Sequence, residues 1–355
     1  MDRFGGGEMK ILTLIFLELL LLPTLGLAGA GCSDVDLREK IGPPMHQGDS
    51  GYCFAHSSST LIQARLGERV SPMHLATGYL LTNPEELEPV SDPAVRAHLT
   101  PEFFSHWRND RALEPGNYAS DKILGESGLL DTGGDEFQTL LVANFRGLCP
   151  EARLPTGENV YKDYLREIVS FHQRRFIAPD ERNQKIGEIM DPEAREKAWS
   201  YRKWVEEKCG ATFRPRQALL PSTLSLAPNL KALRRLEMRP LSSIDLFKGR
   251  NRVLQEIDRQ MDRGNPVAVG YALADLMPDT SIFGREKQPS ADQVDHASVI
   301  AGRKMSGGRC YYYLRNSFGM ETKGYKPRFR GRLQDGGVWI LPEELPSLYS
   351  AVWLD

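Results

Sequence analysis

The sequence predicts an α+β protein in which a helical N-terminal part is followed by a β-rich C-terminal part. From about residue 41 to residue 155, apolar residues recur every three or four positions, which is typical of packed helices. From residue 267 onward, short runs of β-branched and aromatic residues indicate strands. Because each part must bury its apolar faces, we expect the two parts to meet and to leave a cleft at their junction.

Length and composition are those of an ordinary globular protein. The chain has 355 residues, enough for one large domain or two, with 41% hydrophobic and 26% charged residues. Its formal net charge of -2 does not indicate nucleic acid or an anionic membrane as a partner. The sequence contains neither a His-Glu-x-x-His motif nor a Walker-type phosphate loop, so we expect no metal and no cofactor.

The first 30 residues have the pattern of a secretory signal peptide. Lys10 precedes an apolar run over Ile11–Leu22, and Ala28-Gly29-Ala30 offers small residues for cleavage. The run is shorter than the roughly 20 residues that span a bilayer, so we expect no stable membrane span. We therefore predict a signal peptide over residues 1–30 and a secreted, periplasmic or other extracytoplasmic location. A buried N-terminal helix and a lipid anchor on Cys32 are the alternatives.

If the chain is exported, the number of cysteines indicates which kinds of sulfur chemistry to expect. In an oxidising compartment four of five cysteines can form two disulfides, in any of three connectivities, and one thiol is left over. An odd number in a secreted protein indicates one reactive cysteine. The candidates are Cys32, Cys53, Cys149, Cys209 and Cys310.

The helical part, residues 31–155, contains three predicted helices. The first begins at Cys53 and stops at Gly67, with apolar residues on one face. The second begins at Ser71-Pro72, because serine caps a helix and proline fits its first position. The third ends at Gly147. Its apolar stripe consists of Phe137, Leu140, Leu141 and Phe145.

The middle region, residues 156–247, is more polar and richer in charge than the parts on either side. Prolines break it into short pieces, at positions Pro179, Pro192, Pro215, Pro221 and Pro228. Aromatic residues nevertheless recur at helical spacing, and they need a surface to pack against. We interpret the region as an inserted helical subdomain rather than as a disordered linker.

The β-rich part, residues 248–355, begins with a helix over Val253–Met261 that ends at Gly264. Gly307-Gly308 separates two of the strands that follow and indicates a hairpin turn. The predicted strands are Val267–Tyr271, Val294–Gly302, Tyr311–Asn316 and Val338–Leu341.

The segment Gln47–His56 combines three features that thiol chemistry requires. Its glycines allow a tight turn and a close approach of substrate. Cys53 falls at the start of a predicted helix, where the positive end of the dipole stabilises a thiolate. Gln47 carries an amide that can donate a hydrogen bond to a developing oxyanion. His56 lies one turn after Cys53 and can sense the site, although a packing role is the simpler interpretation.

This segment resembles the nucleophile motif of the papain-like cysteine peptidases, the papain and cathepsin type. Ser50 replaces a cysteine that in the family pairs with another just before a downstream Gly-Gly pair. Here Gly133-Gly134 follows Asp131-Thr132, so both cysteines are missing together, which indicates a deleted disulfide. The matching residues are Gln47, Gly48, Gly51, Cys53 and Phe54.

Two stretches of the β-rich part are similar to the histidine strand and the asparagine segment of the same family. His296 lies in the run Val294–Ile300, and Asn316 lies in Leu314–Gly319 with Phe318 where the family usually has tryptophan. The resemblance implies that His296 takes the thiol proton and later protonates the leaving amine. It also implies that Asn316 orients the imidazole ring by a hydrogen bond.

The spacing departs from the family in one respect. Cys53 and His296 are 243 residues apart, against about 130 to 150 in family members. The excess is about the length of the middle region, which we therefore interpret as an insertion between the two halves.

The resemblance carries expectations about fold, substrate and regulation. It implies a papain-like fold, with the active-site cleft between a helical half and a β-barrel-like half, and a peptide or protein substrate. Gly133, Gly134 and Asp295 are candidate substrate-binding residues. Since only a short segment precedes Gln47, where the family has a long propeptide, we expect restraint from the middle region or from a separate protein inhibitor.

The predicted function is that of a secreted cysteine endopeptidase. One alternative is another thiol acyl-transfer enzyme of this fold, such as a transglutaminase or a cell-wall peptide amidase. The serine, aromatic residue and glycine after Asn316 favour a peptidase over these. A second alternative is an inactive binding homologue, but the presence of Gln47, Cys53, His296 and Asn316 argues against it.

Overall fold

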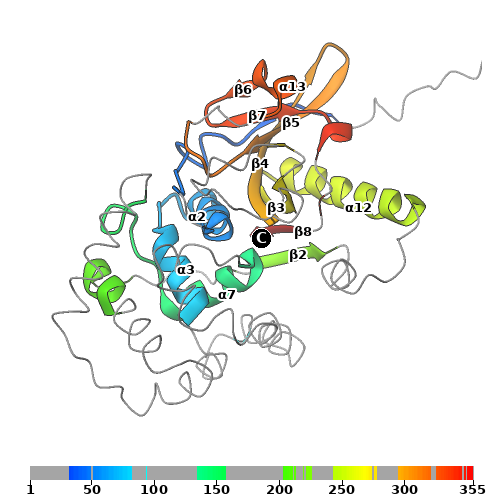
Figure 1. The fold of residues 1–355 in the computed structure, drawn as a ribbon. Coiled ribbons are helices and arrows are strands. Elements are labelled where there is room, and N and C mark those ends of the chain that lie inside the picture. Colours follow the sequence, from blue (N-terminus) through cyan, green and yellow to red (C-terminus); the bar gives the residue numbers. More distant parts are fainter. Residues whose placement is uncertain are drawn as a thin grey trace, which may run out of the picture.

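The α+β class is confirmed in the computed structural model, in which helices accompany one antiparallel sheet (Figure 1). The predicted signal peptide, Gly133 and most of the middle region lie outside the described residues. Those residues are 32–48, 51–81, 93, 134–156, 203–210, 212, 219, 221–225, 243–273, 276–277, 295–320, 325–345, 348 and 350–354.

Helix α2 (Cys53–Leu66) lies between the other N-terminal helices and the sheet (Figure 1). It contacts α3 (Pro72–Leu81) and α7 (Glu136–Arg146), and it also contacts strands of the sheet (Figure 1). Its residues up to Gln63 are all buried, including a histidine and several serines. A helix covered on every side needs no single apolar stripe, so its polar residues are buried as well.

The three predicted helices of the N-terminal part are present, and their ends follow local rules. Gly67 stops α2 with a φ of 76°, and its N–H donates to the carbonyl of Gln63. Glycine adopts this left-handed conformation without a steric penalty. The hydroxyl of Ser71 accepts a hydrogen bond from the N–H of His74 at 3.2 Å, which caps α3. Asp135 caps α7 in the same way.

The sheet contains eight strands, all paired antiparallel. Their order is β2-β8-β3-β4-β5-β7-β6, with β1 paired to β4. Among the described residues the two end strands, β2 and β6, do not pair, so the expected barrel-like half is an open sheet rather than a closed barrel. The bounds are β1 Val35–Asp36, β2 Pro221–Ser225, β3 Val267–Ala272, β4 Asp295–Ser306, β5 Arg309–Arg315, β6 Leu333–Gln334, β7 Gly337–Ile340 and β8 Ser350–Leu354.

The predicted hairpin is the connection between β4 and β5. Ser306 pairs with Arg309, so Gly307 and Gly308 form a two-residue turn, and their φ values are 56° and 72°. A type I′ turn requires positive φ at both positions, which explains two consecutive glycines.

The helix predicted before the sheet is α12 (Ser243–Asp262), and it packs against β3, β4 and β8. Two short helical turns, α13 (Pro327–Arg330) and η6 (Pro342–Glu344), flank β6 and β7.

Strand β2 differs from the expectation for the middle region. It lies inside the range 156–247, which we expected to be helical, yet it pairs with β8 in the main sheet. Pro221 is its first residue, and β2 is an edge strand, where the missing N–H of proline does not interrupt the ladder. At Pro221 the proline therefore marks the start of an edge strand and not a break between helices. A helical segment over residues 203–209 is also described in this range.

The structure selects one of the three disulfide connectivities. Cys32 is bonded to Cys310, and Cys149 is bonded to Cys209. The lipid anchor considered for Cys32 is therefore wrong, because its sulfur is bonded to another cysteine. Two such bonds fit an extracytoplasmic location, since disulfides persist in oxidising compartments. In the described residues, no helix is long and apolar enough to cross a bilayer.

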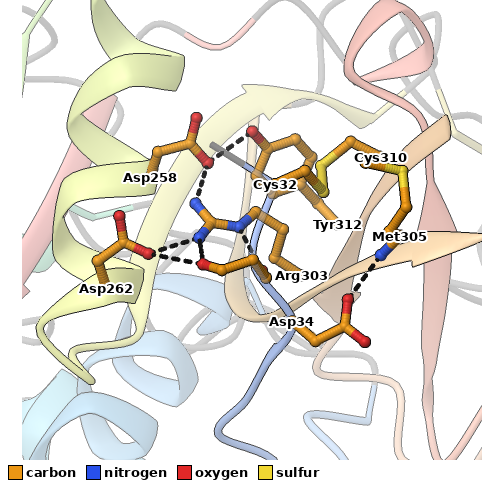
Figure 2. Close-up of a disulfide and its surroundings, with 9 residues drawn as sticks. Cys32, Asp34, Asp258, Asp262, Arg303, Met305, Cys310 and Tyr312 are labelled. Carbon is orange, nitrogen blue, oxygen red and sulfur yellow. Dashed lines mark hydrogen bonds and ion pairs between the residues drawn. A yellow bond between two sulfur atoms is a disulfide. The ribbon is translucent and has the colours of Figure 1, made fainter. Parts of the chain in front are cut away.

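A buried cation lies beside the Cys32–Cys310 disulfide (Figure 2). The fully buried side chain of Arg303 on β4 contacts Asp258 at 2.6 Å and Asp262 at 2.5 Å, both on α12. It also donates to the backbone oxygen of Ser33 at 3.0 Å, and the hydroxyl of Tyr312 donates to Asp258. This cluster joins the N-terminal segment, α12 and the sheet.

Candidate active site

Cys53 is the first residue of α2 and is 8% exposed. Its sulfur lies 3.9 Å from the carbonyl oxygen of Gly51. The peptide dipoles of α2 place partial positive charge at this end, which favours a thiolate over a thiol. Cys53 is also the one cysteine of the chain outside the two disulfides. The residue with the predicted nucleophilic role is thus the residue left with a thiol.

His296 lies on β4 in a cage of aromatic rings. Its imidazole stacks on Phe318 with centroids 5.1 Å apart and planes 15° apart, and it packs edge-to-face with Tyr271, whose ring centroid lies 5.6 Å away. The residue is 3% exposed. Burial lowers the pKa of His296 to about 4, while the hydrogen bond with Asn316 acts in the opposite direction. The imidazole is therefore neutral near pH 7, which is the state a general base needs.

Asn316 follows β5 and holds the imidazole by its side-chain oxygen. Oδ1 lies 2.6 Å from Nε2 of His296 and also accepts the N–H of Ser317 at 2.8 Å. Because a backbone N–H can only donate, the bond from Ser317 identifies this end of the amide as the oxygen. An oxygen facing Nε2 requires the proton of a neutral imidazole to reside on Nε2. Nδ1 of His296 is then the ring atom that can accept a proton.

Gln47 is hydrogen-bonded to Ser317, the residue that follows Asn316. Its backbone N–H donates to the carbonyl of Ser317 at 2.8 Å, and its Oε1 accepts the hydroxyl of Ser317. The neighbouring residues are joined as well, since the N–H of Gly319 donates to the carbonyl of Met45 at 2.9 Å. These bonds bring the Gln47 segment and the Asn316 segment together, although they are far apart in the chain. With Oε1 on Ser317, the NH₂ group lies at the other end of the planar amide.

Helix α2 brings Cys53 to the same part of the molecule. It packs against β4, which carries His296, and against β3 beside it (Figure 1). His46 and His296 both lie close enough to His56, one turn after Cys53, for their protonated forms to lower its pKa. The hydroxyl of Ser59 on α2 contacts Sδ of Met45 at 3.9 Å. The start of α2 therefore lies near both the His296 strand and the segment that contains Gln47.

The structure describes two of the three predicted substrate-binding residues, Gly134 and Asp295. A Cβ on Gly134 would lie 2.6 Å from the ring of Phe54, so this position requires glycine for packing next to the residue that follows Cys53. Gly133 lies outside the described residues. Asp295 is the first residue of β4 and pairs with Ala272, one position before His296. The roles of these residues in substrate binding stay predictions.

Two features of the site escaped the sequence analysis. The hydroxyl of Tyr325 accepts a hydrogen bond from Nδ2 of Asn316 at 3.1 Å. His56 is 2% exposed, and neither ring nitrogen has a hydrogen-bond partner within the described part of the chain. Tyr325 lies in a segment without periodicity, so no sequence pattern connects it to Asn316. The position of His56 one turn after Cys53 was visible, but its burial depends on every element around α2.

A metal site is not apparent in the ranges that the structure describes. No group of three or more His, Cys, Asp or Glu side chains in those ranges could hold a metal ion.

Comparison with known proteins gives only remote similarity. No protein-family model matches the chain, and no curated protein matches it. It is similar to procathepsin L2 proteinase from Tenebrio molitor larval midgut, with 16% identity, a TM-score of 0.39, and coverage of 90% of this chain and 67% of that one. It is also similar to xylellain, a cysteine protease from Xylella fastidiosa, with 15% identity, a TM-score of 0.39, and coverage of 94% and 89%. At these values the similarity carries no argument about function.

Proposed function

We propose that this chain is a secreted cysteine endopeptidase of the papain type, with Cys53 as its nucleophile. One observation carries the proposal. A continuous set of hydrogen bonds runs from Gln47 through Ser317 and Asn316 to His296, near the start of α2. The one cysteine outside the disulfides is the first residue of that helix. A thiol, a neutral imidazole, an amide that orients it and a second amide are the groups that thiol acyl transfer needs.

The acylation step begins with transfer of the thiol proton of Cys53 to Nδ1 of His296. The sulfur attacks the carbonyl carbon of the scissile peptide bond, and the carbonyl π electrons move to its oxygen. The NH₂ group of Gln47 and the backbone N–H of Cys53, which lies at the positive end of α2, stabilise that oxyanion. When the tetrahedral intermediate collapses, His296 gives its proton to the leaving amine, and a thioester remains on Cys53.

Deacylation repeats these roles with water in place of the thiol. His296 takes a proton from water, the resulting hydroxide adds to the thioester carbon, and the thiolate of Cys53 leaves and takes that proton back from His296. Burial disfavours a lone imidazolium, as the lowered pKa of His296 indicates. An imidazolium beside a thiolate or an oxyanion is less disfavoured, because the two charges attract. Asn316 keeps Nδ1 as the accepting atom in both steps.

The test is peptide cleavage in the mature protein compared with Cys53→Ala. Each form is incubated with a peptide library under mild reduction that leaves the two disulfides intact, and products are identified by mass spectrometry. We expect new peptide termini with the wild type and none with the variant. Equal cleavage by both forms, or no cleavage by the wild type, would refute the proposal. A fluorescent alkylamine in the same mixture separates hydrolysis from amide exchange, since a transglutaminase would attach the amine to glutamine side chains.

Export and restraint are part of the same proposal. The two disulfides support passage of the chain into an oxidising compartment, as expected after removal of residues 1–30. Sequencing the N-terminus of the secreted protein tests this, and a start well after residue 32 would contradict it. We further propose that the middle region, or a separate protein inhibitor, restrains access to the cleft.

Deletion of residues 157–200 is the appropriate test of restraint by the middle region. It keeps Cys209 for its disulfide and keeps β2 in the sheet. If the deleted segment covers the cleft, hydrolysis of a small peptide substrate should increase. Unchanged or lost activity in a folded variant would argue against this role.

A further inference from the structure

Tyr325 places a buried hydroxyl against the residue that orients the candidate base. The side chain is 2% exposed, and its oxygen accepts a hydrogen bond from Nδ2 of Asn316 at 3.1 Å. Burial raises the pKa of Tyr325 well above its ordinary value, although the bond with Asn316 acts in the opposite direction. The group is therefore a neutral hydroxyl over the whole range in which a peptidase works.

The position of this hydroxyl is set by contacts other than the one with Asn316. The next backbone N–H, that of Lys326, donates to the carbonyl of Leu276 at 3.0 Å. Phe329, on the short helix α13, is fully buried and anchors the segment to the core. The hydroxyl is thus preorganised, and the amide of Asn316 must fit between it and His296.

The two ends of the Asn316 amide are not equivalent in these surroundings. In the observed orientation, Oδ1 accepts from Nε2–H of His296 and from the N–H of Ser317, and Nδ2 donates to Tyr325. In the reversed orientation, Nδ2 would face the N–H of Ser317, donor against donor. It would also donate to Nε2 of His296, and the ring proton would have to move to Nδ1.

We propose that Tyr325 is a positioning residue that holds the Asn316 amide against Nε2 of His296 and thereby keeps Nδ1 of His296 unprotonated. The inference rests on the proposed role of His296 as the base. An imidazole that carries its proton on Nδ1 cannot take a proton from Cys53. Without the hydroxyl, the acceptor left to Nδ2 of Asn316 among the described residues is the weak Sδ of Met277, at 3.8 Å. The amide is then held less firmly, and the bond between its Oδ1 and Nε2–H of His296, which fixes the tautomer, weakens.

The decisive variant is Tyr325→Phe, which keeps the ring and removes the hydroxyl. We expect kcat on a peptide substrate to fall about five- to tenfold, the size expected for the loss of one hydrogen bond, with KM nearly unchanged. The matched control is Tyr312→Phe, another buried tyrosine, whose hydroxyl donates to Asp258 of α12 rather than to a residue of the candidate site. A kcat for Tyr325→Phe equal to the wild type, or an equal loss in both variants, would overturn the proposal.

A spectroscopic readout separates this proposal from the proposed function. In a Cys53→Ala background with ¹⁵N-labelled histidine, the shifts of His296 at pH 7 report which ring nitrogen carries the proton, and His296→Gln assigns the signals. We expect the Nε2–H form in the parent and a measurable share of the Nδ1–H form after Tyr325→Phe. An unchanged tautomer refutes the positioning role even if peptides are cleaved. A changed tautomer supports it even if the wild type cleaves nothing.

Discussion

Replacing His56 by leucine should stabilise the protein, and the gain should grow as the pH falls. The imidazole lies on α2 with both nitrogens buried and without hydrogen-bond partners in the described residues. Each buried polar group without a partner costs about 1–3 kcal/mol, and leucine fills a similar volume without polar atoms. At pH 7.5, where the imidazole is neutral in both states, we expect a gain of about 1–3 kcal/mol in the free energy of unfolding.

The pH dependence follows from proton binding. Burial lowers the pKa of His56 to about 3, and the charges of His46, Arg69 and His296 act in the same direction. An unfolded histidine titrates near pH 6.5, so the unfolded state binds more protons between these values. The stability present above pH 6.5 is therefore lost as the pH falls toward 3. At pH 5 the loss from His56 is about 2 kcal/mol, and the leucine variant avoids it.

Urea unfolding at pH 7.5 and pH 5.0 measures both effects, with the disulfides intact and a Cys53→Ala background to prevent self-cleavage. Thr60→Val, one turn further along α2, is the control, because it removes a buried hydroxyl that does not titrate. Its effect should be the same at both pH values, whereas the gain from His56→Leu should be larger at pH 5.0. A loss of stability at both pH values, or a gain that does not change with pH, would refute this account.

Three further changes test other parts of the structure. Arg303→Met should lower the free energy of unfolding by about 3 kcal/mol, because two half-exposed carboxylates lose a buried cation. Thermal unfolding measures this loss, and an unchanged melting temperature would contradict the prediction. The double change Cys149→Ser and Cys209→Ser should lower the free energy of unfolding, measured with urea, by about 4 kcal/mol, since the disulfide closes a loop of 60 residues. A loss below about 1 kcal/mol would argue against that disulfide. Gly134→Ala should cost about 1–3 kcal/mol through its clash with Phe54, and a neutral result would mean that the ring moves aside easily.

Sequence alone determined the features that depend on neighbours a few residues away. Helix α2 begins at Cys53 and ends at Gly67, and the β4–β5 turn falls on Gly307-Gly308, because φ preferences and capping act within one turn of chain. The α+β class followed from the change of apolar period, which burial on one face imposes on each element. The candidate residues Cys53 and His296 were chosen by their local motifs.

Only the tertiary structure decided which distant groups meet. It selected the disulfide of Cys32 with Cys310, 278 positions apart, from three connectivities that the cysteine count left equal. It placed the hydroxyl of Tyr325 on Asn316 and buried His56 without hydrogen-bond partners in the described residues. Such contacts form between segments whose separation along the chain carries no pattern, because packing of the whole core determines which surfaces touch. Local chemistry therefore identified the candidate thiol and imidazole, and the packed core determined the orientation and environment of their neighbours.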